Sequence, residues 1–116
     1  MKNRSMLRAG LAMSAMLCLL ASALPAHAAV DEDAAMALAK KDKCTKCHSV
    51  DKKKEGPPFK ETAAKYKGKA DAEAKLITHL TTSPKVKVDC KEEEHANVKS
   101  ASDAELKNLI AYILSR

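Results

Sequence analysis

The chain has 116 residues and a formal net charge of +6, and only 3% of its residues are aromatic. This length fits one small domain. The lysines that make it basic are not interleaved with aromatic residues, which argues against nucleic acid as a partner. A core so poor in aromatic rings would gain from a large apolar prosthetic group.

Residues 1–28 are typical of a secretory signal peptide. A basic start precedes an apolar run over 9–24, and small residues at Ala26 and Ala28 form an A-x-A site. We predict cleavage after Ala28, which leaves a domain over 29–116 with no stable membrane anchor; an uncleaved N-terminal anchor is the alternative. Three of the 21 Lys and Arg residues and none of the 15 acids lie in 1–28, so the remaining domain is mildly basic.

The rest of the chain predicts an all-α domain. The last helix follows Ser102, because Ser102 and Glu105 form a capping-box pattern and apolar residues then recur with helical spacing. The segment 83–101 lacks a sustained helical period, and its "VKV" alternation is too short to support a sheet alone, so we expect an irregular segment there. The three earlier helices are expected over 31–43, 60–66 and 71–82.

The motif "CTKCH" indicates covalent haem attachment, with Cys44 and Cys47 as thioether anchors and His48 as the proximal iron ligand. Two intervening residues let one helical turn present both sulfurs to the porphyrin edge. A dithiol redox motif would need a βαβ context, and a Cys44–Cys47 disulfide would be strained. A zinc site would need further ligands, for which only Cys90 and His95 could serve.

Beyond this motif, "CTKCHSVDKKKEGPPFKETAAKYKGKADAEAKL" and "SDAELKNLIAYILSR" resemble the front and the C-terminal helix of small class I bacterial cytochromes c of the c-551 type. The resemblance covers nearly the whole predicted domain and is weakest over 83–101. It implies a class I cytochrome c fold, with terminal helices packed across one covalently bound haem c. The residues implied at the helix crossing are Ala35 and Ala39, against Leu109, Ile110 and Ile113.

The resemblance also gives Pro57 a role beyond ending a helix. Pro57 matches the family proline whose backbone carbonyl accepts a hydrogen bond from the proximal histidine. Such a bond would orient His48 and strengthen it as a ligand. The alternative is that Pro57 only shapes the loop.

The chain departs from the family pattern at the distal ligand, which is usually a methionine before the last helix. Met36 is the only methionine after residue 28, and it is expected to pack in the core. We predict His95 as the distal ligand, within a residue of the family position, with Cys90 as the alternative. We interpret His79 as a partly buried helix residue. Either predicted ligand favours a lower potential than methionine gives.

We therefore predict a periplasmic monohaem c-type cytochrome that carries one electron between redox partner proteins and is not an enzyme. A haem module that binds or senses NO or CO is an alternative, as is a haem subunit of a larger redox complex. The odd cysteine, Cys90, leaves open a homo- or heterodimer.

Overall fold

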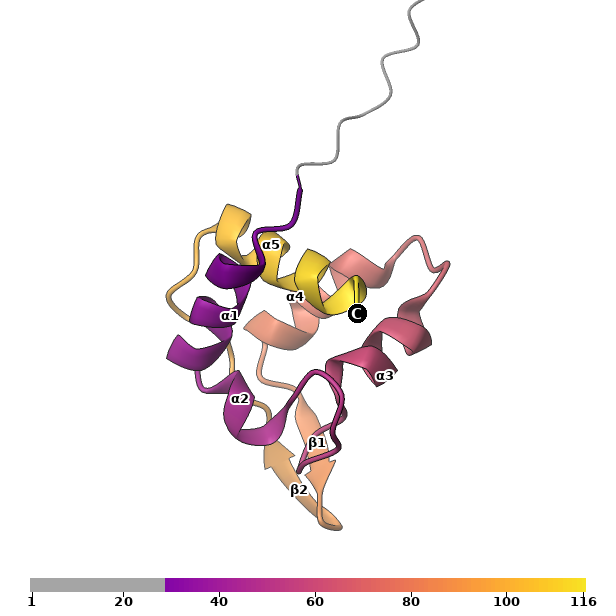
Figure 1. Ribbon diagram of the computed structural model, residues 1–116. Helices are drawn as coiled ribbons and strands as arrows, with labels where there is room; N and C mark the ends of the chain where they lie inside the picture. Colours follow the sequence, from indigo (N-terminus) through magenta and orange to yellow (C-terminus); the bar gives the residue numbers. More distant parts are fainter. Residues whose placement is uncertain (1–28) are drawn as a thin grey trace, which may run out of the picture.

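The structure is a computed structural model that describes residues 29–116, so the predicted signal peptide lies outside the described residues. The longest described helix has 12 residues, and no helix among the described residues is both long and apolar enough to cross a membrane. In chain order (Figure 1) the elements are α1 (Glu32–Lys41), α2 (Cys44–Cys47), α3 (Phe59–Tyr66), α4 (Ala72–Thr81), β1 (Lys85–Val88), β2 (Lys91–Glu94) and α5 (Asp103–Leu114).

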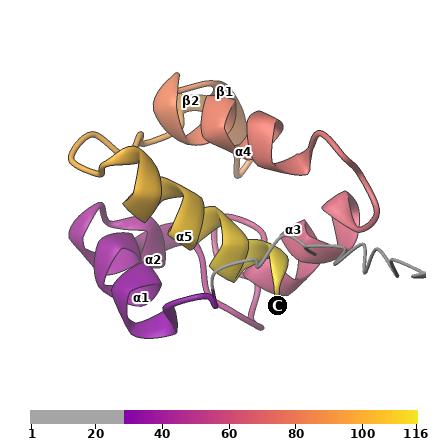
Figure 2. The same cartoon turned by 90° about the horizontal axis from the view of Figure 1, so that it is seen from above.

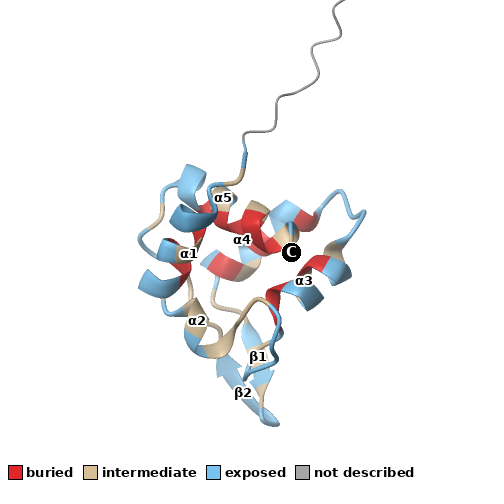
Figure 3. Ribbon diagram, in the orientation of Figure 1, coloured by how far each residue is buried: buried red, intermediate tan, exposed pale blue. Residues whose placement is uncertain are grey.

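The C-terminal helix α5 is the central element. Figure 2 shows α5 between α1 and α2 on one side and α4 on the other, and α3 also packs on it. Ala35 and Ala39 on α1 are 1% and 0% exposed, and Leu109 and Ile110 on α5 are 1% exposed. The buried residues face the helix contacts (Figure 3). The small α1 side chains let the two helices approach closely, as the resemblance implied.

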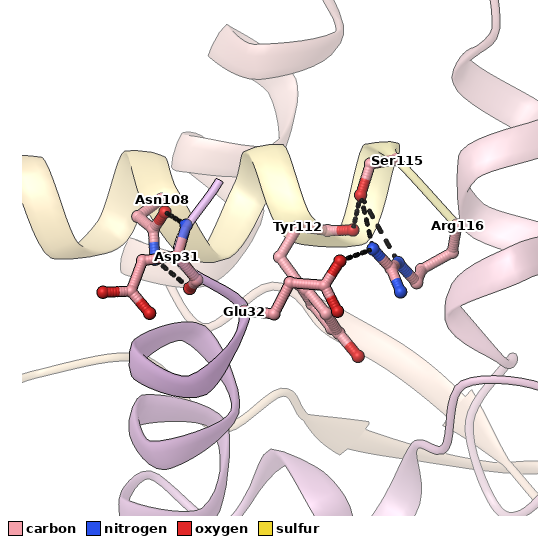
Figure 4. A network of polar contacts seen from close by, with 6 residues as sticks. All are labelled: Asp31, Glu32, Asn108, Tyr112, Ser115 and Arg116. Atoms are coloured by element: carbon pink, nitrogen blue, oxygen red, sulfur yellow. Dashed lines mark hydrogen bonds and ion pairs between the residues drawn. The ribbon is translucent and has the colours of Figure 1, made fainter. Parts of the chain in front are cut away.

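Polar contacts from the middle of α5 and from just beyond its C-terminus attach it to the start of α1 (Figure 4). The side chain of Asn108 accepts a hydrogen bond from the Asp31 N–H at 2.9 Å and donates one to the Asp31 carbonyl at 2.8 Å. The guanidinium of Arg116 pairs with Glu32 at 2.7 Å and lies over the Tyr112 ring, 4.3 Å from its centroid. These contacts hold the two terminal helices in one relative position, which in turn positions the segments between them.

The segment expected to be irregular contains an antiparallel hairpin of β1 and β2. Opposite charges face each other across it, with Lys85 opposite Glu94 and Lys87 opposite Glu92, and such pairs stabilise a sheet. The turn residues Asp89 and Cys90 both have positive φ, 47° and 67°, as tight hairpin turns require. The sequence prediction missed the hairpin because each strand has only four residues and β2 is fully exposed.

Candidate functional site

A cavity of about 630 Å³ lies between α2, α3, α4, α5 and the hairpin. Its volume is in the range of sites that bind cofactors or ligands. Titratable side chains at the cavity include Cys44, Cys47, His48, His79 and His95. The apolar part of its wall includes side chains from the helices and the hairpin: Phe59, Leu76, Leu80, Leu109, Ile113, Val86 and Val88.

The two cysteines of the motif are the first and last residues of α2, a single helical turn. This turn starts after Lys43, which has a left-handed φ of 62°, and it brings both sulfurs to the same cavity. Burial raises the pKa of the Cys44 thiol, and a hydrogen bond to Glu55 raises the pKa of the Cys47 thiol. Both thiols are therefore less acidic than a free cysteine.

His48 follows the turn directly and is held by the loop that returns past it. Its Nδ1 lies 2.7 Å from the carbonyl oxygen of Pro57. A carbonyl only accepts, so Nδ1 carries the proton and Nε2 keeps its lone pair for a metal. The Gly56 N–H donates to the Cys47 carbonyl at 2.8 Å, which fastens the same loop to the motif. The buried Phe59 ring stacks on the imidazole, with 5.9 Å between ring centroids.

Gly56 is a positioning residue that the sequence prediction did not identify. A Cβ at this position would lie 2.5 Å from Cε1 of His48 and 2.9 Å from its Nδ1. The glycine is required by space, because the His48 ring packs directly on its backbone. In the sequence, Gly56 directly precedes Pro57 and Pro58, a stretch that cannot continue a helix, and this pattern does not state where the His48 ring lies.

His95 and His79 lie together at this cavity. Their ring centroids are 4.3 Å apart, and the His95 ring is 6.0 Å from that of His48. Nδ1 of His95 is buried without a hydrogen-bond partner among the described residues. Burial is the main cause that lowers the pKa of both His79 and His95. Both imidazoles are therefore neutral at pH 7, the form that binds metals.

The other two residues considered as ligands lie elsewhere. Cys90 is exposed in the hairpin turn and does not line the cavity. Met36 packs against the edge of the hydrophobic core and also does not line the cavity. The three cysteines in residues 29–116, Cys44, Cys47 and Cys90, are all free thiols. The structure thus brings together the motif, Pro57 and His95, and leaves Cys90 apart.

The donors and the shape of the cavity fit a haem. An imidazole nitrogen binds a metal ion at about 2.0 Å, and the ring centre lies about 1.1 Å behind it, so two imidazoles on opposite sides of one ion have centres about 6 Å apart. The His48–His95 separation of 6.0 Å matches this value. Residues 29–116 contain no group of three His, Cys, Asp or Glu side chains arranged to hold a bare metal ion.

Comparison with known sequences gives cytochromes of one type. Cytochrome c-551 of Allochromatium vinosum is 48% identical over 45 residues, which are 39% of this chain and 48% of that relative. Cytochrome c-551 of Pseudomonas aeruginosa is 46% identical over 67 residues, which are 57% of this chain and 64% of that relative. The chain thus matches from about half to just under two thirds of the length of these curated relatives.

Solved structures match over a larger share of the chain. The class 1 cytochrome MtoD of Sideroxydans lithotrophicus ES-1 is 55% identical with a TM-score of 0.73, over 75% of this chain and 97% of that one. Cytochrome c552 of Nitrosomonas europaea is 34% identical with a TM-score of 0.55, over 69% and 96%. The family model described as cytochrome c matches residues 33–116. The chain therefore belongs to the cytochrome c family, with the class I fold and covalently attached haem c.

Proposed function

We propose that this protein is a one-electron carrier whose haem iron is bound by His48 and His95. The observation that carries the proposal is the pair of imidazoles at one cavity, 6.0 Å apart, beside the two cysteines of the attachment motif. When bound, the haem supplies an iron that alternates between Fe(III) and Fe(II). With both axial positions filled by the protein, the iron has no open position for a substrate, which favours a carrier over an enzyme.

His95 is preferred to Cys90 as distal ligand because of where the two side chains lie. His95 is half-buried and lines the cavity. Cys90 is exposed at the hairpin turn, outside the cavity wall. Two imidazoles donate more strongly to Fe(III) than imidazole with a thioether, so we expect a lower potential than His/Met ligation gives.

The residues around the haem site favour fast electron exchange between Fe(III) and Fe(II). The Pro57 carbonyl fixes the His48 ring and its tautomer, which also increases the basicity of the ligating nitrogen. The apolar wall from α4 and α5 keeps water from the buried side of the cavity. A fixed ligand set in a dry pocket changes little between oxidation states, and a carrier needs this to exchange electrons quickly.

We further propose export to the periplasm, on the basis of residues 1–28 and of the likeness to cytochromes c-551. The partners are then redox proteins that meet the protein near the haem edge. Lys46, Lys53 and Lys54 are exposed beside the motif. Their charge would steer acidic partners toward this side of the molecule, with an effect that salt weakens.

Electron paramagnetic resonance of the ferric protein tests the ligand assignment. We compare the wild type with His95→Ala and with Cys90→Ala as the matched control. We expect a low-spin wild type, an altered signal in His95→Ala and an unaltered signal in Cys90→Ala. A signal changed by Cys90→Ala but not by His95→Ala would overturn the assignment. CO mixed with the reduced wild type tests the gas-binding alternative: we expect the visible spectrum to be unchanged on mixing, with CO binding only as slowly as His95 leaves the iron.

A further inference from the structure

The two histidines at the cavity differ in how their rings are held. His48 donates from Nδ1 to a backbone carbonyl at 2.7 Å, as metal-ligating histidines almost always do. Nδ1 of His95 is buried without any such partner among the described residues. A hydrogen bond therefore fixes the ring of His48, whereas the His95 ring must be fixed in another way.

The ring of His79 is the group in contact with His95. It comes from the last turn of α4, and the two ring centroids are 4.3 Å apart with planes tilted by 56°. This separation is slightly shorter than the usual range of about 4.5–7 Å for packed aromatic rings, so the two rings are in direct contact. Both side chains are half-buried at the same cavity, so His79 restricts the space in which the His95 ring can turn.

Backbone bonds on both sides of His95 make this contact a fixed feature. The His95 N–H donates to the Pro84 carbonyl at 2.8 Å, and the Val98 N–H donates to the Leu80 carbonyl at 2.8 Å. Pro84 lies just beyond the C-terminus of α4 and Leu80 within its last turn. The segment that carries His95 is thus attached to the end of the helix that carries His79.

We propose that His79 is a positioning residue for His95: its ring packs against the distal imidazole and holds it on the iron in place of a hydrogen bond. This inference rests on the proposed function, in which His95 is the distal ligand. Without the His79 ring, His95 leaves the iron more readily. External ligands then bind faster to the distal position, and the ring plane of His95 becomes less fixed.

The test compares the haem-loaded wild type with His79→Ala, with His79→Phe, which keeps a flat ring, and with the exposed control Glu73→Ala on the same helix. CO binding to the reduced protein and cyanide binding to the oxidised protein are measured by stopped flow. The ferric g-values are measured by electron paramagnetic resonance. We expect His79→Ala to bind both ligands about 10-fold faster or more and to stay low-spin with shifted g-values. His79→Phe should return both readouts toward the wild type, and Glu73→Ala should match it.

The proposal is overturned if His79→Ala binds both ligands at the wild-type rate with wild-type g-values, or if His79→Phe behaves like His79→Ala. If His79→Ala gives no soluble haem protein, His79→Asn replaces it with the same expected outcomes. His95→Ala, measured alongside, separates the two hypotheses. An unaltered signal in His95→Ala refutes the ligand assignment itself. If His95→Ala alters the ferric signal but His79→Ala keeps the wild-type ligand-binding rates and g-values, only the role of His79 is refuted.

Discussion

The two sides of the haem cavity are built by different means. On the proximal side, residues 44–59 form one continuous segment, and His48 is bonded to Pro57 only nine positions later. On the distal side, His95 depends on residues of another element, through its backbone bond to Pro84 and its contact with His79. His48 is thus fixed by its own segment, and His95, the proposed distal ligand, by the packing of a loop on a helix.

Because of this difference, different substitutions should disturb the two sides of the cavity. A local segment is disturbed mainly by changes in its own residues, because short-range hydrogen bonds set most of its geometry. A loop attached to a distant helix responds to its own packing, to the hairpin that precedes it and to the helix that follows it. The changes below test this contrast, beginning with the proximal side.

Gly56→Ala should have the largest effect, because the added methyl group would lie 2.5 Å from the His48 ring. We expect a loss of about 1–3 kcal/mol in the free energy of unfolding, together with an altered haem spectrum. Gly68→Ala is the control, since nothing lies within 4 Å of its Cβ position but its φ is +72°. It should cost about 1–2 kcal/mol and leave the spectrum unchanged. Denaturant unfolding measures the two stability losses, and visible spectra report the haem site. Equal visible spectra for both variants would contradict the role of Gly56.

Val98→Ala should have the next largest effect, on the distal side. Val98 is 8% exposed and is the residue whose N–H binds Leu80. Removing two methyl groups from this buried site should cost about 1–2 kcal/mol in the free energy of unfolding. Val88→Ala in the half-buried part of the hairpin is the matched control and should cost less. If Val88→Ala costs as much as Val98→Ala, burial at Val98 is not what holds the distal loop.

The success of the sequence predictions also differs between the proximal and the distal side. The CTKCH motif and the regular period of the last helix are local signals. In the structure the motif forms α2, and the periodic segment forms α5. The capping box at Ser102 and Glu105 is also present, with both of its hydrogen bonds. Gly56 was missed because its role depends on where the His48 ring lies, which the spacing of residues does not state.

The distal side was harder to predict because its signals are long-range. The hairpin depends on charge pairs between strands, and no single four-residue stretch of it has a strong strand pattern. His79 has helical spacing with its apolar neighbours, so the sequence alone gave no reason to bring it against His95. Only the folded arrangement of α4 and the loop places the two rings 4.3 Å apart.

Ser102→Ala should have a smaller effect, at the point where the distal segment ends and α5 begins. The loss of the cap should cost about 1 kcal/mol in the free energy of unfolding at neutral pH. The pKa of Glu105 is held below its usual value, first by the Ser102 N–H and then by its hydroxyl. Stability from a lowered carboxyl pKa is present above the unfolded pKa and lost as pH falls through the folded one. Thermal unfolding across the acid range should therefore show a shallower pH dependence in Ser102→Ala, and an unchanged slope would contradict this account.

Glu92→Lys should have the smallest effect, and it tests whether charge pairing holds the hairpin. The change places a lysine directly opposite Lys87, where the structure has residues of opposite charge in register across the two strands. Because both positions are exposed, we expect a loss of only about 0.2–1 kcal/mol, reduced further by salt. Lys87→Glu combined with Glu92→Lys restores opposite charges in the reverse order and should recover most of the loss. Denaturant unfolding at low and high salt measures both variants. If the double variant is no more stable than the single one at low salt, the register of the distal hairpin depends on its turn at Asp89 and Cys90 and not on its charges.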